Sequence, residues 1–156
     1  VVALGYNYRI DEIRAAIGIE QLKKLPTGNA RREFLTKRYH ERLKQLCPDL
    51  GLPFEESRGQ SSYHIFPVLL PEDGDKAAFR EYLKEQGIQS SFHYPPVHHF
   101  EIYRQYAPES ASELAITETV TQREVTLPLF PTMSEEQQDW VIEATVKALD
   151  NCRLFS

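Results

Sequence analysis

The spacing of apolar residues changes at Cys47–Pro48, and this change limits the folds open to the chain. Before it, apolar residues recur with the period of an amphipathic helix. Two helices are predicted there, over about Ile10–Leu25 and about Ala30–Leu46. A break is expected at Pro26–Asn29, because proline and glycine interrupt helices. The first part of the chain is therefore expected to be a helical hairpin.

After Cys47–Pro48, short apolar runs alternate with turns and with short helical patterns. Strands are predicted over Tyr63–Leu70, Ile88–Phe92 and Val125–Leu129, and helices over about Asp73–Gln86, about Leu114–Gln122 and about Ser134–Leu149. Pro67 predicts that the first strand has an edge position, a bulge, or a backbone position that faces no partner. Gly87 is expected to close a helix as a left-handed cap. The pattern predicts an α+β domain at residues 48–156, with helices packed on a small sheet, preceded by a helical arm at residues 1–47.

Composition excludes several classes of protein. The formal net charge of −5 argues against a nucleic-acid-binding module. No apolar run approaches the roughly 18–20 residues that span a bilayer, and no signal peptide is visible. The two cysteines, Cys47 and Cys152, fit neither a zinc motif nor a C-x-x-C pair. Two unpaired thiols favour a reducing compartment, and the cytoplasm is expected.

The segment Gly5–Ile10 is a polar, glycine-led loop that runs directly into the first predicted helix. Free backbone N–H groups and the positive end of the helix dipole favour anions at such a junction. Asn7 and Arg9 stand beside it, and an amide with a guanidinium fork could complete a phosphate or carboxylate site. The loop therefore predicts an anion-binding element.

A second cluster of polar and aromatic residues lies at His93–His99, where a predicted strand ends in Pro95–Pro96. A rigid loop that carries His93 and Tyr94 is a candidate binding rim; the alternative is a surface loop whose aromatic residues simply pack. A metal site is not expected, because neighbouring histidines are predicted to point differently and no accompanying metal motif is present. The chain also contains no G-x-S-x-G elbow, P-loop or G-x-G-x-x-G motif.

Taken together, these motifs resemble the DegT/DnrJ/StrS family of sugar aminotransferases that depend on pyridoxal 5′-phosphate (PLP). The family's G-x-N-x-R loop and A-A-x-x-x-x-Q-L helix are matched by Gly5, Asn7, Arg9, Ala15, Ala16, Gln21 and Leu22. Its later motifs are matched by Arg31 or Arg32, Tyr39, Leu43, Tyr63, His64, Phe66, Pro67, Gly87, Ile88, His93, Tyr94, Pro96, His98, Leu127, Pro128, Pro131, Met133 and Ser134. Each motif is weak by itself, but their order and spacing extend over nearly the whole chain.

The resemblance implies the small C-terminal domain of a fold-type I aminotransferase, with a short, mainly antiparallel sheet and helices on one face. Asn7 would bind the cofactor phosphate across a dimer interface, with Arg9 close by. The sugar-nucleotide pocket would be lined by Tyr6, His93, Tyr94 and His98. The implied partners are a second subunit, a nucleotide sugar and glutamate or glutamine as amino donor.

The resemblance covers only the C-terminal portion of the family. None of the seven lysines lies in a context like that of the lysine that binds PLP covalently. We therefore expect PLP in the full-length protein but not on this chain, which is expected to be inactive alone. The alternative is a catalytically silent binding or dimerisation module of the same fold. A histidine-rich metal hydrolase is disfavoured by the histidine spacing.

Overall fold

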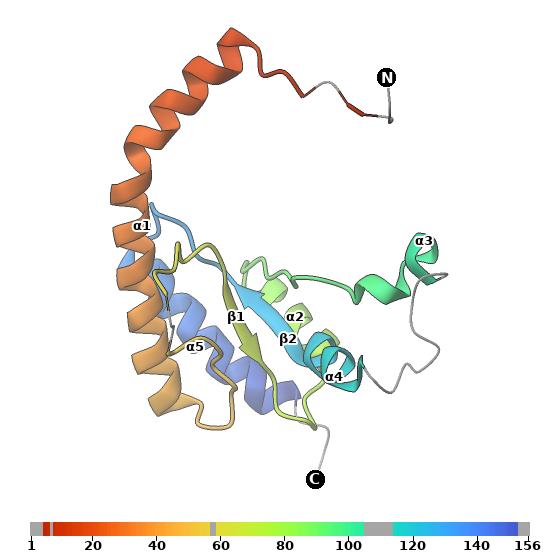
Figure 1. Ribbon diagram of the computed structural model, residues 1–156. Coiled ribbons are helices and arrows are strands. Elements are labelled where there is room, and N and C mark those ends of the chain that lie inside the picture. Colours follow the sequence, from red (N-terminus) through yellow and green to blue (C-terminus); the bar gives the residue numbers. More distant parts are fainter. Residues whose placement is uncertain (1–4, 7, 57–58, 105–113, 153–156) are drawn as a thin grey trace.

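The computed structural model describes residues 5–6, 8–56, 59–104 and 114–152. Along the chain these form the helices and strands α1 (Glu12–Leu46), β1 (Phe66–Leu69), α2 (Lys76–Glu85), η1 (Val97–His99), α3 (Glu101–Arg104), α4 (Ala115–Arg123), β2 (Glu124–Leu127) and α5 (Glu135–Cys152). Figure 1 shows a small two-stranded sheet with helices around it and α1 rising away from it. The predicted α+β class is confirmed.

The helix α1 is continuous, so the predicted hairpin is wrong. Pro26 lies inside α1, where its ring removes one backbone hydrogen bond and costs about 3 kcal/mol relative to alanine. The surrounding sequence is rich in lysine, arginine, leucine and alanine, which favour helix. The helix also has tertiary support directly after Pro26, because Gly28 lies against Pro131 and Arg31 donates to the carbonyl of Met133 at 2.8 Å. One missing bond therefore does not end it.

The two halves of α1 have different surroundings. Leu35, Tyr39 and Leu43 are buried at i, i+4 and i+8 and join the core. Phe34 and Leu46, in the same half of α1, are 46% and 47% exposed. The half before Pro26 projects beyond the sheet (Figure 1) and keeps its large apolar side chains exposed.

The sheet is narrower than predicted. β1 and β2 pair antiparallel, with Phe66 opposite Leu127 and Leu69 opposite Glu124. The predicted strand over Ile88–Phe92 reduces to one bridge, in which Ser91 and Thr126 exchange backbone hydrogen bonds of 3.1 and 2.8 Å. Pro95 and Pro96 follow directly and cannot extend a ladder. A single bridge at Gly51 borders the other side of β1, which agrees with an edge position, one of the alternatives predicted from Pro67.

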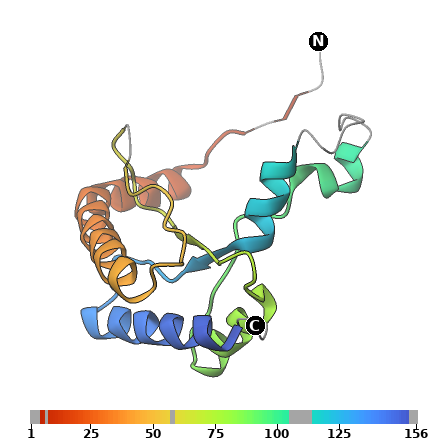
Figure 2. The same ribbon diagram turned by 90° about the horizontal axis from the view of Figure 1, so that it is seen from below.

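The helix caps follow the sequence closely. Ser134 and Gln137 form a reciprocal capping box at the start of α5, with bonds of 3.1 and 2.9 Å. At the end of α2, Gly87 has a φ of 74° and Ile88 donates to the carbonyl of Leu83, so the predicted left-handed cap is confirmed. The helices α2 and α5 pack against each other along one side of the sheet (Figure 2).

Packing of α1 on α5 completes the core. The side chain of Gln138 is fully buried and donates to the carbonyl of Leu35 at 2.7 Å. Arg38 reaches both carboxylate oxygens of Asp139 at 2.7 and 2.8 Å. Cys47 and Cys152 are buried and not bonded to each other. Within the part of the chain that the structure describes, no helix is long and apolar enough to cross a membrane.

Candidate functional site

A chain of hydrogen bonds holds His93 against β2. The backbone N–H of His93 donates to Oε2 of Glu124 at 2.9 Å. The Thr126 hydroxyl lies 2.5 Å from Oε1 of Glu124 and 2.8 Å from Nδ1 of His93. Glu124 and Thr126 are both buried, at 6% exposure. Because burial without a partner is costly for polar groups, this network has to be satisfied as a unit.

The network selects one tautomer of His93. An ionised Glu124 only accepts hydrogen bonds, so the single hydroxyl proton of Thr126 goes to it. The Thr126 oxygen must then accept from His93, which places a proton on Nδ1. Nε2 of the neutral ring is left as an acceptor. The ammonium group of Lys76 interacts electrostatically with the Glu124 carboxylate.

His93 lines a small cavity of about 170 Å³, together with His64, Gln89, Ser91 and Pro128. His64 precedes β1 and is exposed. The cavity therefore combines two imidazoles with amide and hydroxyl groups, which suits a polar, hydroxyl-bearing ligand.

The segment His93–His99, called the rim below, carries the other predicted ligand-binding side chains. Tyr94 is 70% exposed, and its ring meets that of His93 edge to face at 4.8 Å. His98 and His99 do not point apart as expected. Both place Nε2 against Oε1 of Glu118, at 2.5 and 2.8 Å.

The loop before α1 is separate from the rim. It lies at the far end of the exposed half of α1 (Figure 1), where Tyr6 and Tyr8 are 86% and 85% exposed. Arg9 is exposed too, whereas Asn7 lies outside the described residues. The structure therefore brings together His93, Tyr94 and His98 within the rim, and leaves Tyr6 and Arg9 on a distant loop.

The helix end beside this loop is not the open anion site that the sequence suggested. Asp11 caps α1 by accepting the N–H of Arg14 at 2.8 Å, and its other oxygen pairs with the Arg14 guanidinium at 2.9 Å. A carboxylate already occupies the positive end of the helix dipole. An anion bound here would depend on side chains of the loop, such as Arg9.

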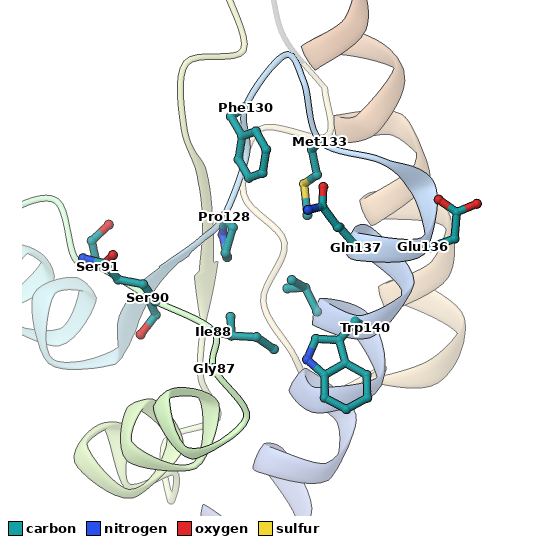
Figure 3. A pocket seen from close by; sticks show the side chains of 12 residues that line it. Gly87, Ile88, Ser90, Ser91, Pro128, Phe130, Met133, Glu136, Gln137 and Trp140 are labelled. Carbon is teal, nitrogen blue, oxygen red and sulfur yellow. The ribbon is translucent and has the colours of Figure 1, made fainter.

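A larger cavity lies elsewhere (Figure 3). Its volume is about 710 Å³, and it opens between the end of α2, the loop after β2 and the start of α5. Ile88, Phe130, Met133 and Trp140 make it mainly apolar, and Glu136 is its one carboxylate.

Sequence reasoning missed Glu118, Glu124 and Thr126. The latter two share a strand face at i and i+2, a spacing visible in the sequence, but the predicted strand began after Glu124. Glu118 lies twenty positions from His98, and nothing local in the sequence connects the two residues.

Residues 1–146 match the model of the DegT/DnrJ/EryC1/StrS aminotransferase family. The chain belongs to this family, which confirms the resemblance drawn from the motifs.

Individual relatives agree with this assignment. The chain is 31% identical to uncharacterized protein MJ1066 of Methanocaldococcus jannaschii, over 98% of this chain and 40% of that protein. It is similar to S. venezuelae DesV in complex with a ketimine intermediate, with a TM-score of 0.84 and 31% identity over 96% of this chain and 39% of DesV. Bacillus subtilis NtdA with bound cofactor PMP gives a TM-score of 0.81 and 30% identity over 96% of this chain and 35% of NtdA. The chain thus spans about two fifths of the length of these proteins.

Proposed function

We propose that this chain is the C-terminal part of a PLP-dependent aminotransferase that transfers an amino group from glutamate or glutamine to a keto-sugar nucleotide. The observation that carries the proposal is the family match over residues 1–146, with the fold shared over 39% of DesV. Residues 1–47 would link to the PLP-binding part, and residues 48–156 would form the small domain. The cytoplasm is the proposed location.

The rim would contact the sugar nucleotide. His93 offers an acceptor nitrogen toward hydroxyl groups, since its other nitrogen is engaged by Thr126. Tyr94 offers an exposed ring on which a base or sugar could stack. His98 would border the same pocket, and Tyr6 would approach it from a second subunit. A composite site of this kind would explain why Tyr6 lies so far from the rim on one chain.

The cofactor would be held only in part by this chain. When bound, PLP supplies the electron sink for amino transfer. Arg9 and Asn7 would contribute to its phosphate, and an exposed arginine on a loop suits that role. The described side chains fit a contact with the PLP phosphate. They do not fit the role of the lysine that binds PLP covalently.

The lysines support the proposed inactivity of the isolated chain. All seven lie on helices. Five have partners within the chain: Lys23 with Glu20, Lys37 with Glu33, Lys44 with Glu55, Lys84 with Glu81, and Lys76 with the carbonyl of Thr121. A lysine that binds PLP needs a free amine facing the cofactor. The other two lysines, Lys24 and Lys147, are exposed on helix surfaces, and we propose that the anchoring lysine belongs to another part of the full-length protein.

A homodimer is the proposed assembly. Ile13 and Leu22 on the projecting half of α1 are 75% and 66% exposed, and Ile10 just before α1 is 67% exposed. Exposed apolar side chains gathered on one segment favour association. The same observation supports the alternative, a catalytically silent dimerisation module.

Two experiments test the proposal. The chain, incubated with PLP and reduced with borohydride, should show no single lysine labelled stoichiometrically and in preference to the other six by peptide mass spectrometry. A chimaera of an active family aminotransferase, carrying this chain in place of its matching C-terminal segment, should aminate a keto-sugar nucleotide. Stoichiometric labelling of one lysine of the chain would contradict the proposal that the anchoring lysine lies elsewhere. A chimaera that folds, dimerises and holds PLP without transferring an amino group would favour the silent module.

A further inference from the structure

His98, His99 and Glu118 place three metal-binding groups at one point. Nε2 of His98 lies 2.5 Å from Oε1 of Glu118, and Nε2 of His99 lies 2.8 Å from the same oxygen. The three ligand atoms all lie within 4.8 Å of one another. Among the described residues, no other group of histidine, cysteine or carboxylate side chains meets this criterion.

Two independent segments build this cluster. The histidines belong to the short helix η1, whose turn is held by the bonds from His99 to the carbonyl of Pro96 at 3.0 Å and from Phe100 to that of Val97 at 3.1 Å. Their rings lie 4.5 Å apart at 72°, so adjacent residues direct their nitrogens to the same place. Glu118 approaches from α4, where it lies in the first turn.

The donor set suits a divalent transition-metal ion. Imidazole favours zinc, copper, iron and nickel, and one carboxylate with two imidazoles leaves coordination positions for water or another ligand. In a tetrahedral zinc site with bonds of about 2.0–2.1 Å, the ligand atoms are roughly 3.3 Å apart. The present separations of 2.5 and 2.8 Å belong to hydrogen bonds, so a modest outward rotation of the Glu118 side chain would make room for the ion.

The site is open enough to exchange an ion with solvent. The side chain of His98 is 17% exposed, that of His99 is 54% exposed, and that of Glu118 is 30% exposed. A metal ion bound there would replace the two N–H protons and cross-link the rim to α4. The cross-link would hold the far end of the rim, as Glu124 and Thr126 hold its first residue.

We propose that His98, His99 and Glu118 bind a divalent transition-metal ion, with Zn²⁺ as the representative, and that this ion fixes the rim to α4. The site shares His98 with the proposed sugar-nucleotide pocket, but His99 and Glu118 lie outside the residues proposed to contact PLP or the sugar nucleotide.

The test uses the full 156-residue chain without a histidine tag. Titration with Zn²⁺ by calorimetry should give one site per chain, Zn²⁺ should raise the melting temperature, and Co²⁺ should produce visible absorption bands of a nitrogen- and oxygen-ligated ion. His99→Ala is the main variant because its side chain is the most exposed of the three and its loss should not unfold the chain. It should weaken Zn²⁺ binding by at least about tenfold, by analogy with the 10–100-fold effects of outer-shell partners.

Two further variants test whether Zn²⁺ binds at this cluster or at any exposed histidine. Glu118→Gln should also weaken Zn²⁺ binding and abolish the rise in melting temperature. His64→Ala, which removes an exposed histidine outside the cluster, should leave both unchanged. The proposal is overturned if the wild-type chain shows no Zn²⁺-dependent change, or if His99→Ala binds Zn²⁺ as tightly as the wild type. Neither readout involves PLP or amino transfer, so the result is independent of the proposed function.

Discussion

The carboxylate of Glu124 accepts the backbone N–H of His93 at 2.9 Å. A buried side chain of β2 therefore holds the first residue of the rim, even though the chain around His93 forms only one bridge with that strand. The position of the candidate binding residues depends on side chains more than on the sheet ladder.

Replacing Thr126 with valine should disturb both His93 and the fold. His93 Nδ1 would lose its acceptor and Glu124 would lose a donor, which should lower the free energy of unfolding by about 1–3 kcal/mol. ¹⁵N-resolved NMR of the imidazole should show the Nδ1–H tautomer in the wild type and a mixture in Thr126→Val. Thr119→Val is the matched control, because that hydroxyl bonds only a carbonyl on the surface of α4. A wild-type ring protonated at Nε2 alone would contradict the network.

Gly28 and Gly51 should respond oppositely to alanine. A Cβ at Gly28 would meet Pro131 at 3.5 Å, which is ordinary contact. Alanine should therefore stabilise α1 by about 0.5–1 kcal/mol. At Gly51 a Cβ would lie 2.9 Å from that of Leu69. Alanine should therefore push the segment at position 51 away from β1 and lower the free energy of unfolding by about 1–3 kcal/mol. Urea unfolding of both variants measures this difference, and equal effects would contradict the local packing.

The thiol of Cys47 should make the chain less stable at high pH. Burial raises its pKa from 9.0 to about 11. Between these values the unfolded chain releases the thiol proton while the folded chain retains it, so the stability due to this group is full below pH 9 and is lost as pH rises through the folded pKa. The difference in unfolding free energy between wild type and Cys47→Ala should shrink over this range. A difference that stays constant with pH would argue against the raised pKa.

Protonation of His40 should lower the stability of the chain in mild acid. Burial lowers the pKa of His40 below 6.5, although Glu55 opposes this shift and Lys44 adds to it. Its Nδ1 is buried without a hydrogen-bond partner in the described structure. The stability that His40 contributes through its lowered pKa is fully present above pH 6.5, and it is lost as the pH falls through the pKa of the folded chain. NMR titration of the ring should give a pKa below 6.5, and His40→Phe should flatten the loss of stability in mild acid.

The sequence predicted those parts of the fold that are decided by residues a few positions apart along the chain. The start of the last helix at Ser134 and the left-handed Gly87 are decided within a few positions, and both were predicted. The break at Pro26 was wrong because contacts made later in the chain, at Pro131 and Met133, support the helix there.

The candidate site was predicted only in part, for the same reason. His93, Tyr94 and His98 are recognisable from their own loop, but Glu118, Glu124 and Thr126 act on it from elements far along the chain. Only the pairing of β1 with β2 and the placement of α4 bring these groups together.

The continuity of α1 through Pro26 also sets the angular phase of the loop at its start. A helix turns by about 100° and rises by 1.5 Å per residue, so the direction in which Tyr6 and Arg9 face is fixed by the residue count back to the anchored half at Leu35. One inserted residue would swing that loop by more than a quarter of a circle, whereas seven would return it to nearly the same heading. The arm can thus tolerate changes of composition much better than changes of length.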